Sequence, residues 1–287
     1  MIDLHLHSTA SDGQYTPAQV VELAHQAGVT TLALTDHDTT AGLSQATQAA
    51  HNLDLTFFQG IELDCRYPGI GGNFHMLGYG IDPAHPALAD FCQNFAQQRR
   101  ERAERIFTYL AERGMPLDRA AVEEKVTGVI GRPHFARAMV EAGYVADTRE
   151  AFDKYLDTED FQRIDRPKPH PKEAIARIRQ AGGVAVLAHP NQLKLGERSL
   201  KNLLEELKGD GLAGVECYYS THTPDQTAHY LTLAAELDLL VSAGSDFHGE
   251  QVKADIAIGT GKDGSLRVEG PLSLVTHLQT RKDGSTP

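Results

Sequence analysis

Short apolar runs alternate with amphipathic helical patterns along most of this 287-residue chain. The apolar runs, which are typical of β-strands, cover residues 2–6, 31–35, 55–63, 74–81, 183–188, 213–218 and 239–243. The helical patterns between them cover residues 16–28, 42–51, 172–181, 199–208 and 224–236. This order predicts an α/β fold built on a parallel sheet or barrel of about seven strands, with the helices outside. A further apolar stretch at residues 254–258 is a candidate edge strand.

Residues 97–166 interrupt this alternation. Helical patterns at residues 97–113, 118–126, 134–142 and 149–156 follow one another there without an apolar run of the strand type. The sequence Arg-Pro-Lys-Pro-His-Pro at 166–171 then predicts an extended hinge, because proline fixes its own backbone angle and cannot donate a helical hydrogen bond. We therefore predict a small all-helical insertion domain at residues 97–166, within a barrel formed by residues 1–96 and 167–287.

The composition excludes several classes of protein. The chain is 41% hydrophobic and 23% charged, which is ordinary for a globular protein. No apolar run approaches the roughly 18 residues of a membrane span, and residues 1–5 lack the basic region of a signal peptide. Three widely spaced cysteines without a CxxC pair indicate reduced thiols, so we expect a cytoplasmic protein without a membrane partner. The net charge of −12 argues against binding to long duplex nucleic acid, but it allows a small anionic substrate held by metal ions.

Histidines and carboxylates gather where the predicted strands end. Side chains two residues apart in a strand share a face, so His5 and His7 point the same way at the end of the first strand. Such a pair alone is as often two surface histidines as a site, but Asp246 and His248 repeat it after the last long strand. The other candidates are His37, Glu62 and His189 at strand ends and Asp12 in the loop after the first strand. Active sites of α/β barrels are built at the C-terminal ends of the strands, so we expect these residues to face one rim.

His75 stands at the start of a predicted strand and needs a different argument. Only residues 63–74 separate it from Glu62, and this segment contains Pro-Gly-Ile-Gly-Gly at 68–72. A helical crossover needs about a dozen residues by itself. A hairpin is therefore the better prediction. Its antiparallel second strand would bring His75 beside Glu62 at the same rim.

Nine residues thus form a candidate metal centre. They are His5, His7, Asp12, His37, Glu62, His75, His189, Asp246 and His248. A single catalytic zinc uses three protein ligands, so nine ligands suit two or three divalent ions if a carboxylate such as Glu62 bridges them. Mixed nitrogen and oxygen ligands without cysteine favour Mn, with Zn or Fe as alternatives. Asp36 and Asp38 alternate with His37 and point the other way, so we expect them to be helix caps or partners of the ligands.

Six motifs resemble those of the polymerase and histidinol phosphatase (PHP) family. They are Asp-Leu-His-Leu-His-Ser at 3–8, Ser-Asp-Gly at 11–13, Ala-Leu-Thr-Asp-His-Asp at 33–38, Gly-Ile-Glu at 60–62, Ala-His-Pro at 188–190 and Ser-Asp-Phe-His at 245–248. The resemblance implies a distorted seven-stranded barrel and a phosphoesterase centre of two or three metals. It also implies three ligand sets: His5, His7, Glu62 and Asp246; Glu62, His75 and His189; and Asp12, His37 and His248.

The sequence Gly-Arg-Pro-His at 131–134, inside the insertion, resembles the subgroup that contains 3',5'-nucleoside bisphosphate phosphatases and short-RNA 5'-exonucleases. Two interpretations are open. In the first, Arg132 is an ordinary surface residue and His134 is an ordinary helix residue. In the second, Arg132 binds phosphate oxygens and His134 protonates a leaving alkoxide. Weaker candidates for a second phosphate are Arg99, Arg100, Arg102, Arg105 and Lys168. The histidines expected at the surface are His25, His51, His85, His170, His222, His229 and His277.

The residues and the resemblance together predict an enzyme, a metal-dependent phosphomonoesterase that removes the 3'-phosphate of 3',5'-bisphosphorylated nucleosides such as adenosine 3',5'-bisphosphate. Attack by a metal-bridging hydroxide would depend on Glu62 and Asp246, with Arg132 binding phosphate and His134 acting as the acid. The alternative on the same centre is 5' to 3' hydrolysis of short RNA. Histidinol phosphate is disfavoured, because the arginines of the insertion suit an anionic substrate. A non-catalytic metal- or nucleotide-binding module is the remaining alternative, weakened because no expected ligand is missing.

Overall fold

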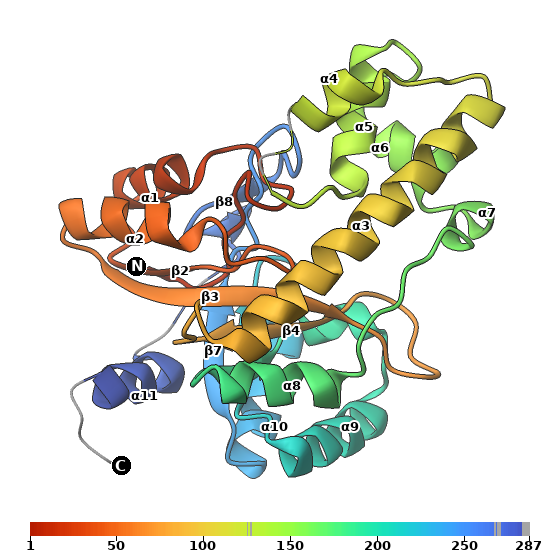
Figure 1. The fold of residues 1–287 in the computed structure, drawn as a ribbon. Helices are drawn as coiled ribbons and strands as arrows, with labels where there is room; N and C mark the ends of the chain where they lie inside the picture. The colour runs from red at the N-terminus through yellow and green to blue at the C-terminus, as the bar shows by residue number, and fades with distance from the viewer. Residues whose placement is uncertain (125, 127, 267, 269–270, 283–287) are drawn as a thin grey trace.

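The computed structural model describes residues 1–287 except 125, 127, 267, 269–270 and 283–287, and its main element is a seven-stranded sheet (Figure 1). The strands are β1 (Ile2–Asp3), β2 (Thr31–Leu34), β3 (Thr56–Cys65), β4 (Phe74–Tyr79), β5 (Val184–Leu187), β6 (Gly214–Tyr219) and β7 (Leu240–Gly244). They lie in chain order, and β4 runs antiparallel to both of its neighbours. Beyond β1 and β7, Leu6 bridges Phe247, and the Leu4 amide donates to the Ala243 carbonyl. This pairing nearly closes the sheet and confirms the predicted distorted barrel.

Five helices cover the outside of the barrel at positions close to those predicted. They are α1 (Pro17–Gln26), α2 (Leu43–Asn52), α8 (Pro171–Gln180), α9 (Glu197–Asp210) and α10 (Pro224–Glu236). The start of α1 follows the predicted signal. The Thr16 hydroxyl accepts a hydrogen bond from the Gln19 amide, the Gln19 side chain accepts one from the Thr16 amide, and Pro17 occupies the first helical position. Such start signals explain why the sequence places these helices well.

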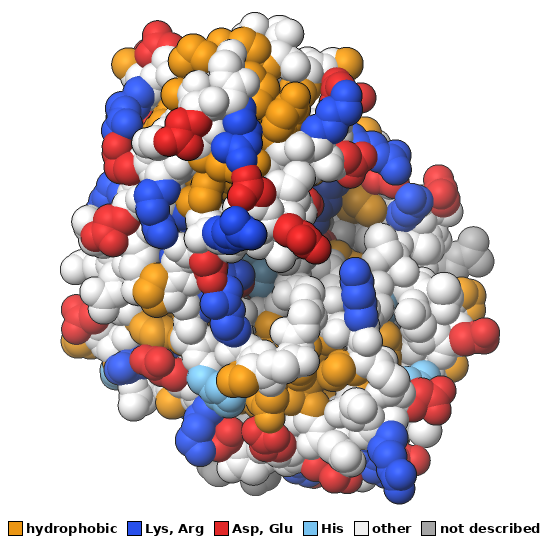
Figure 2. Space-filling model, turned by 90° about the vertical axis from the view of Figure 1, so that its right-hand side faces the viewer, with side chains coloured by type: hydrophobic (Ala, Val, Ile, Leu, Met, Phe, Trp, Pro, Cys, Tyr) orange, Lys and Arg blue, Asp and Glu red, His pale blue; other side chains and the backbone are white. Residues whose placement is uncertain are grey.

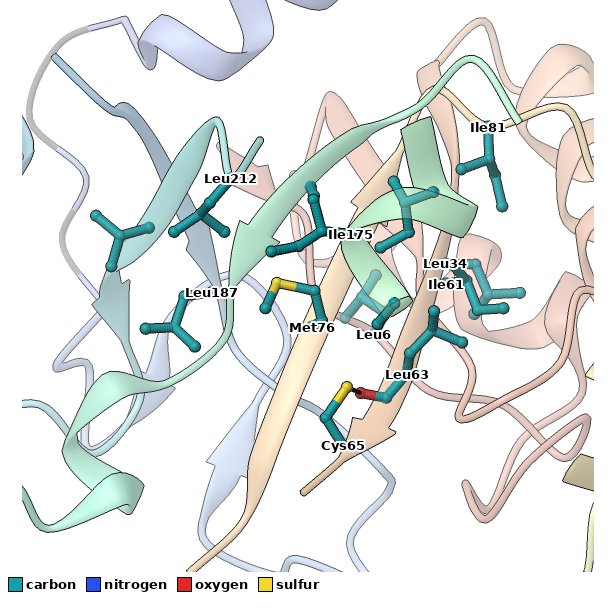
Figure 3. Packing of buried hydrophobic residues seen from close by; sticks show 14 of the residues in the cluster. Leu6, Leu34, Ile61, Leu63, Cys65, Met76, Ile81, Ile175, Leu187 and Leu212 are labelled. Atoms are coloured by element: carbon teal, nitrogen blue, oxygen red, sulfur yellow. Dashed lines mark hydrogen bonds between the residues drawn. The ribbon is translucent and has the colours of Figure 1, made fainter. Parts of the chain in front are cut away.

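The strands bury apolar side chains on both faces. Outer-facing residues pack against the helices, as Figure 3 shows for Met76 and Leu187 near Ile175 of α8. Inner-facing residues such as Phe58 fill one end of the barrel together with helix α11 (Ser273–Lys282), which contributes Leu278. Burial of each large apolar side chain contributes about 1.5–3 kcal/mol. Because apolar side chains close that end, the polar inner-facing residues gather at the other.

Helix α3 (Pro86–Glu112) connects the barrel to the insertion and begins eleven residues before the predicted Gln97. His85 caps it by accepting the Ala87 amide, with Pro86 at the first helical position. The extra turns exist because Leu88 and Phe95 pack into the barrel core. The helix is about 40 Å long and crosses diagonally from the barrel to the insertion (Figure 1). The predicted boundary between residues 96 and 97 therefore falls inside one continuous helix.

The described residues of the insertion form helices and connecting loops, with no strand among them. Beyond α3 its helices are α4 (Arg119–Glu124), α5 (Arg132–Glu141), α6 (Thr148–Ala151) and α7 (Glu159–Gln162), with a π-helical turn at Phe152–Leu156. It has a small apolar core of its own, in which Phe107, Phe135 and Phe161 are buried. A separate core is what a distinct structural unit requires. The division into domains at residues 97 and 166 stays a prediction.

Two predictions for the C-terminal part were wrong or incomplete. The apolar stretch at 254–258 does not pair at the edge of the barrel. Its strand β8 (Ile256–Ala257) pairs with β9 (Gly261–Lys262) in a separate two-stranded sheet, because the chain reverses within a few residues. Helix α11 was not predicted. Among the described residues, no helix has the length and apolar character needed to cross a membrane.

Candidate metal centre

All nine candidate ligands converge at the end of the barrel away from α11. Most of them are deeply buried: His5 and His7 have no exposed surface, and Glu62 retains 1%. Figure 2 shows a hollow between the insertion and the barrel, with histidine at its base and basic side chains around it. The prediction that these residues gather at one rim of the barrel is therefore confirmed. Their role as metal ligands stays a prediction.

Glu62 lies at the centre of the cluster. Its Oε1 lies 2.9 Å from His75 Nδ1 and 3.1 Å from His189 Nε2. Its Oε2 lies 3.0 Å from His37 Nδ1 and 3.2 Å from His7 Nε2. One carboxylate thus faces imidazoles on both sides. This is the geometry expected of a bridging ligand.

The predicted β3–β4 hairpin explains how His75 reaches Glu62. The two strands are antiparallel, and Asp64 of β3 pairs with His75 at the start of β4. The start of β4 therefore lies beside the end of β3. The sequence argument from the short connection is confirmed.

The second carboxylate of the centre belongs to Asp246, after β7. Its Oδ1 lies 3.3 Å from His7 Nε2, 3.4 Å from His248 Nδ1 and 3.5 Å from His5 Nε2. Asp12 Oδ1 lies 3.4 Å from His248 Nε2 on the outer side of the cluster. Carboxylate and imidazole atoms therefore alternate across the whole rim.

Three groups of these side chains have ligand atoms within 4.8 Å of one another. The groups are His5, His7, Glu62 and Asp246; His7, Asp12, His37 and His248; and His37, Glu62 and His75. The first matches the set implied by the family resemblance. The second is the implied third set with His7 added. In the last group His37 takes the place of His189, although His189 Nε2 is also 3.2 Å from His75 Nδ1.

Unpaired buried atoms indicate that these residues fit divalent ions. Although some of them lie within 3.5 Å of one another, these buried side-chain atoms of the centre form no hydrogen bond of acceptable geometry: His5 Nε2, His7 Nδ1, His7 Nε2, His37 Nδ1, Glu62 Oε2 and His189 Nδ1. Buried polar atoms without partners are costly, and such a concentration at one place calls for a ligand. Imidazole nitrogens and carboxylate oxygens suit Mn, Zn or Fe. The donor set supports divalent metals without selecting one.

Burial and the neighbouring charges shift the pKa values of several groups in the centre. Burial by itself would raise the pKa of Glu62, but the imidazoles of His37 and His75 outweigh it and hold that pKa well below its usual range. Burial lowers the pKa of His37 to about 3, so this ring is neutral near pH 7. Burial opposes protonation of His7 too, yet Asp246 and Glu62 raise its pKa to about 9. Ion binding at His7 would therefore release a proton.

The backbone is unusual where it supports these side chains. His189 has a positive φ of 26° and Asp246 one of 59°, conformations that side chains other than glycine rarely adopt and that collect at functional sites. Gly244 at the end of β7 lies so close to β1 that an added Cβ would be 2.1 Å from the Cβ of His5. Glycine there allows the two strands to meet.

Behind the ligands lie three polar residues that the sequence motifs do not reveal. Glu216 of β6 is fully buried, with Oε1 2.9 Å from His5 Nδ1 and Oε2 accepting the His189 amide at 2.7 Å. Asp246 Oδ2 accepts hydrogen bonds from Tyr219 at 2.7 Å and from Lys253 at 2.6 Å. A carboxylate behind a ligating histidine fixes the tautomer that leaves the other nitrogen free for metal.

Asp36 behaves as predicted for a partner of the ligand-bearing loops. Its carboxylate accepts hydrogen bonds from the Ser8 amide, the Ser8 hydroxyl and the Ser11 hydroxyl. These bonds hold the loop that carries His7 and Asp12. Asp36 therefore acts on the centre through the backbone of another strand.

A second charged cluster lies beside the centre. Asp38 Oδ2 accepts Arg99 Nε of α3 at 2.9 Å and Arg166 Nη2 of the hinge at 2.7 Å. Asp64 Oδ2 accepts Arg166 Nη2 at 2.9 Å, and Lys168 Nζ lies 2.9 Å from Asp64 Oδ1. Three cations thus face two carboxylates. Of these cations, Arg166 was not singled out in the sequence, although the charged hinge contains it.

His134 and Arg132 occupy different surroundings. His134 is 5% exposed, and its Nδ1 accepts a hydrogen bond from the Gly131 amide at 3.1 Å. Burial lowers its pKa to about 4, with Arg137 adding to the effect and Asp12 opposing it. Arg132 is paired with Asp157 of the insertion and lies over the ring of Phe152. His134 is therefore within the electrostatic reach of the centre, whereas Arg132 is engaged within the insertion.

One of the histidines expected at the surface is buried. His222 is 6% exposed, its Nδ1 lies 2.9 Å from the Cys217 carbonyl, and its ring contacts Tyr230. The expectation was wrong for this residue, because a histidine without a polar sequence partner can bond to the backbone instead. His85 and His170 prove to be helix caps.

Comparisons with known proteins identify the family of this chain. A family model described as the PHP domain matches residues 3–158. The chain is 35% identical over 249 residues to a 3',5'-nucleoside bisphosphate phosphatase from Chromobacterium violaceum, covering 86% of this chain and 87% of that protein. It is 34% identical over 246 residues to a 5'-3' exoribonuclease from Haemophilus influenzae, covering 86% and 89%. The solved structure of an amidohydrolase from C. violaceum matches with a TM-score of 0.85 and 32% identity over 98% of this chain and 96% of that one.

Fold and site together define a hydrolase of the metal-dependent α/β-barrel class. The chain belongs to the PHP domain family, since the family match spans more than half of it and long relatives exceed 30% identity. It is an enzyme that hydrolyses phosphoesters. The family and the reaction class predicted from the motifs are confirmed.

Proposed function

We propose that this enzyme removes the 3'-phosphate from 3',5'-bisphosphorylated nucleosides. The observation that carries the proposal is the cluster of unpaired ligand atoms around Glu62, with His134 and the Asp38–Asp64 cation cluster beside it. The ligand atoms around Glu62, with His134, can act on a phosphoryl group, and the cations at Asp38 and Asp64 can bind a further anion. The relative named for this activity supports the choice.

The nine-residue centre would hold two or three divalent ions; we propose Mn, with Zn or Fe as alternatives that the same donors suit. Such ions supply positive charge to the phosphoryl oxygens and lower the pKa of an attacking water. The chain's own contribution is placement. Glu62 faces imidazoles on both sides, and Asp246 presents Oδ1 while Tyr219 and Lys253 hold its Oδ2.

The second phosphate of the substrate would bind at Arg99, Arg166 and Lys168. Lys168 and Arg166 both contact Asp64, whose Oδ1 is 3.6 Å from His75 Nε2, so the cations adjoin the centre. The three cations exceed the two carboxylates that they contact by one charge, which favours an anion. Arg132 remains a proposed phosphate ligand, and it would have to exchange Asp157 for the substrate.

His134 would donate a proton to the departing sugar oxygen. The Gly131 amide occupies Nδ1, so the neutral ring carries its proton on Nε2. Full proton transfer requires the charged ring, and the low pKa opposes that state in the free enzyme. A bound phosphate dianion would raise this pKa, because an adjacent negative charge favours the charged ring. Substrate binding would then create the acid that the reaction needs.

Cleavage of short RNA from its 5' end is the second candidate. It requires the same bond to break, between phosphorus and the 3' oxygen of a 5'-phosphorylated nucleotide. The relative from H. influenzae that bears this name supports it. The two candidates differ in what lies beyond the scissile phosphate.

A phosphate-release assay with Mn tests the proposal. The substrates are a 3',5'-bisphosphonucleoside, the matching 3'- and 5'-monophosphates, a 5'-phosphorylated dinucleotide and a sugar phosphate. We expect the bisphosphonucleoside to have the highest kcat/KM. A higher value for the dinucleotide, measured as mononucleotide release, would favour the exonuclease. No turnover of any nucleotide would contradict both.

The role of His134 has a separate test in the variant His134→Asn. General-acid catalysis is typically worth about 10²–10⁴-fold when the leaving group is poor. The variant should therefore lose most turnover on the nucleotide and much less on p-nitrophenyl phosphate, whose leaving group departs without a proton. The control is His51→Asn, an exposed histidine on α2. Equal losses on both substrates, or a lowered metal content, would show that His134 binds phosphate or metal instead.

A further inference from the structure

A cleft of about 430 Å³ lies between the barrel and the insertion, next to His134. The loop after β1 forms one wall with Thr9, Gly13 and Gln14, and helices α4 and α5 form the other with Val122 and Ala138. The volume falls within the roughly 300–1,000 Å³ of small-molecule sites. His134 is part of the lining, so the cleft begins where the proposed leaving oxygen would lie.

Charge is distributed unevenly in this cleft. Arg137 is half-buried, and its Nη1 lies 3.5 Å from the carbonyl oxygen of Asp12, a candidate metal ligand. Asp118 and Glu141 also line the cleft, and both are exposed. The cation therefore lies at the metal end, and both carboxylates lie at the solvent side, with Glu141 within electrostatic reach of Arg137. Phosphate groups are disfavoured at the carboxylates, whereas an uncharged group is not.

The surface contributed by the insertion is largely apolar. Leu117 and Ala138 pack at the edge of the insertion core, and Val122 is buried there. The opposite wall is polar: the Gln14 side chain accepts the Gln251 amide, and the Gln14 amide donates to the His248 carbonyl. A flat heterocycle with polar edges matches one apolar and one polar wall.

We propose that this cleft binds the nucleobase of the leaving nucleoside. This inference rests on the proposed function, because it assigns the part of that substrate that lies beyond the 3' oxygen. A leaving oxygen at His134 directs the attached ribose and base into the adjoining cleft. The phosphates remain with the metal centre and the cations at Asp38 and Asp64. The helical insertion then confers base binding, and the barrel performs the hydrolysis.

Two neighbouring alanines on α4 provide a matched test. Ala121 lines the cleft and Ala120 does not, and both side chains are exposed, so neither change disturbs the core. Ala121→Trp fills the cleft, whereas Ala120→Trp adds the same bulk outside it. The substrates are a 3',5'-bisphosphonucleoside and glycerol 2-phosphate, a secondary alkyl phosphate without a base.

We expect Ala121→Trp to raise KM for the nucleotide by roughly ten-fold, because a base displaced from the apolar wall would lose on the order of 1.4 kcal/mol of contact. Its kcat/KM for glycerol 2-phosphate should stay within about two-fold of the unmodified enzyme, and Ala120→Trp should leave both substrates unchanged. An unchanged KM for the nucleotide, or equal losses on both substrates, would overturn the assignment.

Binding of free adenosine to the Mn-loaded protein separates this inference from the proposed function. Equilibrium dialysis should show binding that Ala121→Trp removes and Ala120→Trp preserves. If no nucleotide is hydrolysed but this pattern holds, the proposed function is wrong and the cleft assignment stands. If adenosine binds equally to all three proteins, or to none, the cleft assignment is wrong whatever the enzyme hydrolyses.

Discussion

Replacing Glu216 by Gln should weaken metal binding although Glu216 is not a candidate ligand. Its two oxygens have fixed tasks, since Oε2 accepts the His189 amide and Oε1 faces His5 Nδ1. A backbone amide can only donate, so the oxygen of the new glutamine would stay with His189. Its NH₂ group would then face His5 and donate to Nδ1. His5 would carry its proton on Nε2, the atom that faces Glu62 and Asp246.

The expected loss follows from this change of tautomer. Changes to a partner of a ligating histidine typically cost about 10–100-fold in metal affinity. This corresponds to about 1.4–2.7 kcal/mol at the site formed by His5, His7, Glu62 and Asp246. The shape of the side chain is preserved, so the fold should be maintained. The sites that do not include His5 should retain most of their affinity.

Isothermal titration of the apo-protein with Mn²⁺ measures the effect. Glu205→Gln is a matched control, because Glu205 is exposed on α9. Thermal unfolding in the presence of a chelator verifies that Glu216→Gln is folded. Unchanged affinity at every site in a folded variant would refute the reasoning. So would an equal loss in the control.

Three further predictions concern the centre and the neighbouring His134. Protein from Mn-supplemented medium should contain about two or more divalent ions per chain by elemental analysis. A metal content near zero, together with activity that survives a chelator, would contradict the metal mechanism. Glu62→Gln should lose far more activity and metal than Asp12→Asn, since Glu62 belongs to two of the ligand groups and Asp12 to one. If the two variants retain the same activity and the same metal content, Glu62 does not bridge two ions. Between pH 6.5 and 4 the unfolded chain binds a proton at His134 that the folded chain, with a pKa of about 4, does not. As the pH is lowered through that range, the unfolding free energy should therefore fall by up to about 1.4 kcal/mol per pH unit. Denaturant unfolding of His134→Asn should show a shallower dependence of this free energy on pH.

The sequence predicted the parts of the molecule that local rules determine. The HxH spacing placed His5 and His7 on one face, and the short connection before His75 required a hairpin. Both arguments use only chain geometry over a few residues, and the structure agrees with them. The start of α3 was missed although a signal existed, namely Pro86 followed by apolar residues at Leu88 and Phe95.

Residues that act from behind the ligands could not be predicted in this way. Glu216 lies within an apolar strand and has no polar neighbour in sequence that marks it. Its partners His5 and His189 are 211 and 27 residues away along the chain. The pairing of Asp38 with Arg99 and Arg166 likewise depends on how α3 and the hinge cross the rim. Such contacts follow from tertiary packing, which a single sequence does not display.

The β3–β4 hairpin has a consequence for the order of folding. Glu62 and His75 are only 13 residues apart, whereas Glu62 and His189 are separated by 127. Hairpins of this size form in about 1–10 μs, and the entropic cost of closing a loop grows with its length. We therefore expect this pair of side chains to meet before the barrel closes. A nascent chain would then already contain both residues of this pair when only its first third had been synthesised.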